Sequence, residues 1–237
     1  MAVCQDGGPG STRQAASALE LFLRHMEKTA GLESGALKGA YQTSRAACET
    51  YVKEQKVGLA VLDLPTLLSR LDGWKLQPIA HMGSHDARRY HVLVRQGEAA
   101  DLAGLKDKVV YVSGSNDPAY VYGLLLDQKV PRDHFKMKRA RRALKGVRAV
   151  ARGKADGTLV EADVVEHLGD LDLPTTLTSI HASQGLPGLT LVVVGLHAPE
   201  GSLVKKLEAA LPRLCDGEGA KLCKTFRVKA FKKANAT

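Results

Sequence analysis

Short apolar runs alternate with amphipathic stretches along most of this chain, and this alternation constrains its fold more than any other feature. Residues 57–62 (VGLAVL) form an apolar run with the length of a buried strand. Residues 12–26 place Leu19, Phe22 and Met26 at helical spacing. Strands that alternate with helices are typical of an α/β fold in which mostly parallel sheets are flanked by helices. We therefore predict an α/β fold.

The same order of elements occurs twice. A break at residues 96–98 is followed by a predicted strand (108–112), a turn (113–117) and a helix (118–127). This order repeats the short strand, glycine-rich turn and helix predicted at the beginning of the chain. The repetition predicts two structural units rather than one continuous sheet.

The length of 237 residues is sufficient for two lobes. We predict that residues 1–84 and 187–237 form the first lobe and that residues 85–186 form the second. The chain would cross between the lobes twice, near the apolar strands 89–95 and 189–196, and a cleft would lie between the lobes.

Polar residues gather in the loops that follow the predicted strands. Ligands of open α/β sheets bind outside the carboxyl ends of the strands, where helix beginnings present unpaired N–H groups. Helix capping explains some of the same residues, and the similar design of GGPGST (7–12) and SGSNDPAY (113–120) favours ligand binding. The candidate ligand contacts are Gly10, Ser11, Thr12, Asp63, Ser115, Asn116, Asp117, Tyr120, Arg142 and Glu161.

The net charge of +9 has a local origin. Residues 134–154 contain nine basic residues and no acidic one, residues 205–237 contain nine basic and three acidic ones, and the remainder is net acidic. A nucleic-acid face would add exposed aromatic residues or a binding module, and only 5% of the residues are aromatic. We therefore expect no nucleic-acid partner, and we expect solvated lysines with one or two arginines among Arg139, Arg141 and Arg142 pointing into the cleft.

Catalytic and metal-binding motifs are absent from the sequence. It contains no GxSxG elbow and no HExxH, and the spacing of His81, His85 and His91 matches no known set of metal ligands. We expect no catalytic residue, no metal and no cofactor. An acid or base role for Asp63 or Glu161 remains an alternative.

The longest apolar run, LTLVVVGL at residues 189–196, is too short to span a membrane. The first ten residues have neither the basic nor the apolar segment of a signal peptide, so we expect that the protein is cytosolic or that a leader has been removed. The strand predicted at residues 2–5 is short for a core strand, so we expect the natural chain to extend further upstream. The four cysteines are too few for a disulfide scaffold. Cys4 could pair with Cys48 and Cys215 with Cys223, although spacing alone does not fix the connectivity.

Three segments resemble the substrate-binding proteins of bacterial ABC importers, and most closely their phosphate- and phosphonate-binding subfamily. They are KVGLAVLDLPTLL (56–68), ADLAGLKDKVVYVSGSNDPAYVYGLLL (100–126) and AVARGKADGTLVEAD (149–163). The resemblance implies the type II two-lobed fold of periplasmic binding proteins. It also implies that Tyr120 lies in the ligand loop and that Glu161 can hold an amino group of a ligand. Asn116, Asp117 and Pro118 stand where the family usually has Ser-Thr-Ser.

The resemblance implies a non-enzymatic protein that captures a small anionic or zwitterionic, phosphate- or phosphonate-like ligand in the cleft for ABC-type uptake. A transporter permease would be its partner, and the chain would act as a monomer in the periplasm or at the cell surface. One alternative is an enzyme on the same two-lobed fold that uses Asp63 or Glu161. Another is an effector-sensing module that acts on a protein partner through the basic tail.

Overall fold

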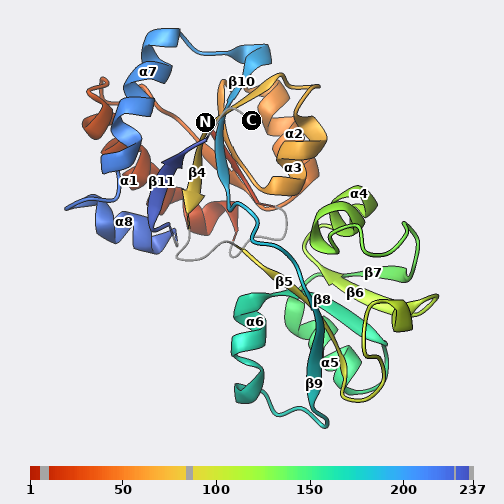
Figure 1. The fold of residues 1–237 in the computed structure, drawn as a ribbon. Helices are drawn as coiled ribbons and strands as arrows, with labels where there is room; N and C mark the ends of the chain where they lie inside the picture. The colour runs from red at the N-terminus through yellow and green to blue at the C-terminus, as the bar shows by residue number, and fades with distance from the viewer. Residues whose placement is uncertain (6–10, 84–87, 227, 235–237) are drawn as a thin grey trace. The chain divides into compact units, whose positions relative to one another are not determined.

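The computed structural model describes residues 1–5, 11–83, 88–226 and 228–234. The chain divides into two compact units: unit 1 comprises Met1–Ala87 and Pro187–Thr237, and unit 2 comprises Arg88–Leu186 (Figure 1). The predicted boundary between residues 84 and 85 lies outside the described residues. Just inside unit 2, the two connecting segments are joined by an antiparallel bridge between Arg88 and Leu186.

Unit 1 has a six-stranded sheet within the described residues. In spatial order its strands are β11 (Ala230–Lys233), β4 (Leu76–Gly83), β10 (Thr190–Val194), β3 (Leu59–Leu62), β1 (Ala2–Cys4) and β2 (Ala40–Gln42). Every residue of β10 is buried, because helices cover both faces of the sheet at its centre.

The side chains of β3 alternate between the two cores of unit 1. Leu59 and Val61 belong to a cluster with α1 (Thr12–Ala30), α7 (Gly201–Ala210) and α8 (Gly219–Thr225). Ala60 and Leu62 belong to a cluster with α2 (Arg45–Glu54) and α3 (Leu64–Arg70). The side chains of β3 point alternately to the two faces of the sheet. Because helices cover both faces, every position of the strand is apolar.

Unit 2 has a five-stranded sheet in the order β7 (Lys136–Ala140), β6 (Val109–Ser113), β8 (Gly157–Glu161), β5 (Tyr90–Arg95) and β9 (Leu177–Ala182). Helix α5 (Ala143–Ala151) packs on one face through Val147, which contacts Leu93 and Val160. It approaches closely because residue 146 is glycine: a Cβ there would lie 2.3 Å from the Thr158 hydroxyl oxygen. Helix α6 (Ala162–Glu166) adds further apolar residues to the same cluster.

The α/β fold class is confirmed, but the sheets are mixed rather than mostly parallel. In unit 1 the parallel pairs are β1 with β2 and β1 with β3, whereas β10 runs antiparallel to β3 and β4. In unit 2, β5 runs antiparallel to β8 and β9. Strands β5 and β10 each follow a crossing of the chain between the units. Each is antiparallel to the parallel strands of its sheet, β5 to β8 and β10 to β3.

Several elements differ from the sequence-based expectations. The helix expected over residues 118–127 consists of α4 (Pro118–Tyr120) followed by a π-helical segment (Val121–Leu125). The segment expected to be a basic tail contains α8 and the edge strand β11, in which Phe231 is buried. Strand β2 and helix α6 were not predicted, because three and five residues are too few to establish a periodicity.

Both cysteine pairs that the sequence left open form disulfides. Cys4 at the end of β1 is joined to Cys48 in α2, and Cys215 is joined to Cys223 in α8. The first bond closes a separation of 44 residues and the second one of 8 residues. The first bond therefore restricts the unfolded chain more, because loop-closure entropy grows with loop length.

A buried carboxylate fixes the loop that leads from α1 to β2. Glu27 is 2% exposed and accepts hydrogen bonds from the backbone N–H groups of Gly35 and Leu37, and it pairs with Arg24. Burial alone would raise the pKa of Glu27, but these donors stabilise the charged form more and lower the pKa below its usual value.

We predict that Glu27→Gln lowers the free energy of unfolding by about 2 kcal/mol, because a carboxamide NH₂ would face a backbone donor in a buried site. Urea denaturation checks this, with Glu20→Gln as the control at an exposed position of the same helix. The stabilisation by Glu27 is complete above the unfolded-state pKa of glutamate, about 4.3, and is lost as the pH falls through the lower folded-state pKa. The wild-type protein should therefore lose more stability in acid than the variant, and equal losses would contradict the assignment.

Candidate ligand-binding site

The strands of unit 2 bring six of the candidate residues to one edge of its sheet. β6, β7 and β8 run parallel, so that their carboxyl ends share that edge, with Ser113 paired with Ala140. β5 begins there because it is antiparallel to β8, which places Tyr90 opposite Glu161. The residues that follow these strand ends are Ser115, Asn116, Asp117, Tyr120 and Arg142, and Glu161 is the last residue of β8.

The loop between β6 and α4 is fixed by its own hydrogen bonds and by β7. The Ser113 hydroxyl donates to the Leu159 carbonyl at 3.0 Å, and the Asp117 N–H donates to the Ser115 hydroxyl oxygen at 3.3 Å. Gly114 has a φ of +79°, which a residue with a side chain rarely adopts. The Arg139 guanidinium donates to the Gly114 carbonyl at 3.2 Å, so that this loop and the end of β7 are held together.

Asp117 is the N-cap of α4. Its carboxylate accepts hydrogen bonds from the N–H groups of Ala119 at 2.9 Å and Tyr120 at 3.3 Å. These donors would otherwise be available to an external anion. The side chain of Asp117 therefore serves the capping role that the sequence also allowed.

Glu161 lies within a cluster of polar side chains at the start of β5. The Tyr90 hydroxyl donates to the Glu161 carboxylate at 3.2 Å, and the Arg88 guanidinium lies 3.7 Å from the same oxygen. Burial, followed by the negative charge of Glu161 and by Tyr120, raises the pKa of the Tyr90 hydroxyl well above its usual value. Tyr90 therefore remains a hydrogen-bond donor to Glu161 at neutral pH.

Arg88 is the counter-ion of Glu161. Burial alone would lower the pKa of its guanidinium, but Glu161 and Tyr90 outweigh this effect, and the pKa is raised. The carboxylate thus already has a cationic partner supplied by the chain.

The first turn of α5 differs from those of the helices with side-chain caps. Ser11 caps α1, Ser44 caps α2, Asp63 caps α3 and Asp117 caps α4. The N-cap of α5 is Arg142, which provides no side-chain cap because a guanidinium has only donors. The helix has no acidic residue in its first turn, and the neighbouring Arg139 and Arg141 are exposed. The positive end of the helix dipole therefore coincides with exposed guanidinium groups.

The remaining candidates belong to unit 1, at the carboxyl ends of β1 and β3. The Ser11 hydroxyl oxygen accepts from the Gln14 N–H at 3.3 Å, and Thr12 is the first, exposed residue of α1. The Asp63 carboxylate accepts from the Thr66 N–H at 2.9 Å. Gly10 lies outside the described residues.

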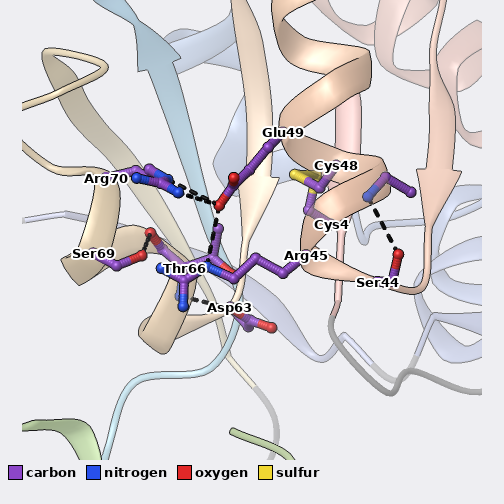
Figure 2. The surroundings of a disulfide bond; sticks show 10 residues. Cys4, Ser44, Arg45, Cys48, Glu49, Asp63, Thr66, Ser69 and Arg70 are labelled. Atoms are coloured by element: carbon purple, nitrogen blue, oxygen red, sulfur yellow. Dashed lines mark hydrogen bonds and ion pairs between the residues drawn. A yellow bond between two sulfur atoms is a disulfide. The ribbon is translucent and has the colours of Figure 1, made fainter. Parts of the chain in front are cut away.

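Figure 2 shows the disulfide and the ion pairs that link the elements at the carboxyl ends of β1 and β3 in unit 1. The Cys4–Cys48 disulfide joins β1 to α2, and Glu49 on the same helix forms ion pairs with Arg45 and Arg70. Arg70 ends α3, so Glu49 links the two helices that begin at the strand ends.

Sequence reasoning missed Arg88 and Tyr90, which belong to the cluster around Glu161. Their place depends on the register between β5 and β8 and on the bridge of Arg88 to Leu186, and neither is visible in a single sequence. The described residues contain no group of three or more His, Cys, Asp or Glu side chains that could hold a metal ion. Among them there is also no helix long and apolar enough to cross a membrane.

Comparison with known proteins identifies the family of this chain and supports its fold. The family model described as ABC transporter, phosphonate, periplasmic substrate-binding protein matches residues 10–237. No curated protein matches the chain.

Three solved structures are similar to this one. The binding protein component of an ABC phosphonate transporter from Pseudomonas aeruginosa has a TM-score of 0.67 at 16% identity, over 98% of this chain and 80% of that one. XAC2383 from Xanthomonas citri, bound to ATP, has a TM-score of 0.75 at 12% identity, over 99% and 91%. PhnD1 from Prochlorococcus marinus (MIT 9301), in complex with methylphosphonate, has a TM-score of 0.63 at 16% identity, over 100% and 93%. At these identities the three structures establish the two-lobed fold.

The capping role of Asp117 gives a prediction about stability. Asp117→Ala should lower the free energy of unfolding by about 1 kcal/mol, whereas Asp117→Asn should change it little because asparagine caps helices equally well. Urea denaturation of both variants checks this. If the asparagine variant loses as much stability as the alanine variant, the carboxylate acts through its charge and not as a cap.

Proposed function

This chain belongs to the family of phosphonate-type periplasmic substrate-binding proteins of ABC transporters, and from that premise we propose that its solute is a small anion without an ammonium group. Members of the family bind a solute for ABC-type uptake and are not enzymes, so the alternative of an enzyme that uses Asp63 or Glu161 does not apply. The family is periplasmic, and the two disulfides agree with an oxidising compartment. We propose that the chain acts as a monomer with a transporter permease as its partner.

The observation that carries the proposal is the uncapped, cationic first turn of α5. Positive side chains at the positive end of a helix dipole repel it. A bound anion would relieve this repulsion and would accept hydrogen bonds from the backbone N–H groups of the first turn. The exposed guanidinium of Arg142 could form a bidentate, charge-assisted pair with phosphonate or phosphate oxygens. We therefore propose Arg142 as the principal contact of the anionic group.

Other candidates complete this proposed contact set. The Ser115 hydroxyl and the Asn116 amide follow β6 at the same sheet edge and can donate to an anion. Tyr120 adds a hydroxyl beside Tyr90. For Gly10, Ser11 and Thr12 in unit 1 we retain the same role, whereas we propose that Asp63 and Asp117 act by capping the helices that carry the loops.

The pairing of Glu161 with Arg88 supports the second part of the proposal. A ligand's ammonium group at Glu161 would have to compete with a guanidinium that the chain already holds 3.7 Å away. We therefore propose that Glu161 orients Arg88 and Tyr90 instead of binding an amino group. This favours the anionic over the zwitterionic ligand class.

We predict that Arg142→Gln weakens the binding of methylphosphonate by about tenfold or more, because a hydrogen bond to a charged group is worth about 1.5–3 kcal/mol. Isothermal titration calorimetry with methylphosphonate and with inorganic phosphate measures this. Arg152→Gln, at the other end of α5, is the matched control and should bind normally. Equal affinities of the two variants would remove Arg142 from the site.

The role of Arg88 predicts a change in selectivity. Arg88→Gln leaves Glu161 without its counter-ion, so the affinity for 2-aminoethylphosphonate should rise by about tenfold relative to that for methylphosphonate. Calorimetric titrations with both compounds give this ratio, and Arg89→Gln, which changes the exposed neighbour, should leave it unaltered. An unchanged ratio in Arg88→Gln would contradict the assignment of Glu161, even if methylphosphonate itself binds.

A further inference from the structure

A second group of cations on unit 2 lies outside the proposed ligand contacts. Along α5, the exposed residues Lys145, Arg148 and Arg152 follow one another at spacings of three and four residues, and the exposed Leu144 precedes Lys145. The opposite side of the helix is buried. With Lys136 and Lys138 of the edge strand β7, these residues define what we call the basic face.

The two lysines of β7 lie on the side of the sheet that α5 covers. Lys138 pairs with Tyr111, and a Cβ at Gly146 of α5 would lie 3.3 Å from the Tyr111 Cβ. Tyr111 therefore faces α5, and residues paired across neighbouring strands point to the same face. Lys138, and Lys136 two residues earlier, consequently point to the side of α5, and both are exposed.

Leu144 makes this surface more than a solvated helix face. It is 41% exposed and lies one turn before Arg148, with Lys145 next to it. The exposed part of Leu144 lies in water among cations. The apolar side of α5 is buried in unit 2, so a bilayer would meet one apolar side chain, Leu144, flanked by lysine and arginine; apolar and basic residues of this kind mediate the contact of helices with anionic lipid surfaces.

We propose that the basic face binds the surface of an anionic lipid bilayer. The cations would pair with lipid phosphates, and Leu144 would insert between headgroups. Nucleic acid fits this face less well, because the exposed large hydrophobic side chains of the described residues are all leucines and provide no ring for base stacking. The permease of an ABC transporter lies in the membrane, so a periplasmic protein held at its surface would meet its partner more often.

Acidic residues on and just after the neighbouring helix α6 determine which side of unit 2 would face an anionic bilayer. α6 packs in the same apolar cluster as α5, and its exposed Asp163 and Glu166 are followed by the exposed Asp170. An anionic bilayer repels these groups. The attraction therefore acts through the side of unit 2 that carries α5 and β7, and it does not depend on which solute the protein binds.

Sedimentation of the full chain with lipid vesicles tests this proposal. We expect binding to vesicles of phosphatidylethanolamine and phosphatidylglycerol, little binding to vesicles of phosphatidylcholine alone, and weaker binding as the salt concentration rises. Lys145→Glu combined with Arg148→Glu should lower the vesicle partition coefficient by tenfold or more, since each cation near the surface contributes about fivefold. Leu144→Ser should lower it as well.

The matched control is Lys205→Glu combined with Lys206→Glu, which makes the same change in net charge at exposed positions of α7 in unit 1. It should retain most of the binding. Equal losses in the two double variants would mean a general attraction of the net charge and would overturn the proposal, as would unaltered binding of the α5 variant. Tighter binding of a single-stranded DNA oligonucleotide than of the vesicles, lost in the same α5 variant, would also overturn it. Arg148→Gln, a single neutralisation, provides a second variant with an intermediate expected loss.

Discussion

The proposed ligand-binding edge of unit 2 depends on the register between β5 and β8. Parallel strands β6, β7 and β8 end at one edge, and β5 enters the sheet in the opposite direction, so that Tyr90 faces Glu161 across the pair. Because side chains alternate along a strand, a slip of β5 by one residue would turn Tyr90 to the other face of the sheet, away from Glu161. The contact of Tyr90 with Glu161 and the ion pair of Arg88 with Glu161 both require this register. A carboxylate without them would be an open site for a cation.

Side-chain caps distinguish α1 to α4 from α5 and α6, which follow strand ends of unit 2 without such a cap. At α1 and α2 a serine, and at α3 and α4 an aspartate, accepts the N–H groups that an external anion could otherwise use. The first turn of α5 begins at Arg142, which can only donate, and arginines surround it. Helix α6 begins at Glu161 and has Asp163 in its first turn, so its negative charge disfavours an anion, and the capacity to bind one is greatest at α5. Further along the same helix, cations and an exposed leucine form a separate surface, for which we propose a different partner.

The sequence permitted the prediction of the fold class, of most elements and of the loops that follow the strands. The apolar run before Asp63 and the repeated order of strand, turn and helix carried this information, since period and turn residues are local properties. The directions of β5 and β10 were not predicted, because they depend on where the chain crosses between units. Neither was the partner of Glu161, because Arg88 lies 73 positions away in sequence and only the sheet register brings the two together. From sequence, Asp117 suited both a cap and a ligand contact, whereas Asp63 was expected as a ligand contact. Their hydrogen bonds show that both side chains cap helices.

We propose above that the protein captures a small anionic solute. A thermal-shift titration of the unmodified chain with methylphosphonate, inorganic phosphate, methanesulfonate, glycine and putrescine tests it most directly. A ligand at one hundred times its dissociation constant stabilises the folded state by about 2.7 kcal/mol, which is large enough to measure. We expect a concentration-dependent rise of the melting temperature with methylphosphonate or phosphate and none with putrescine. A rise with putrescine or glycine, in the absence of any shift with the anions, would contradict it.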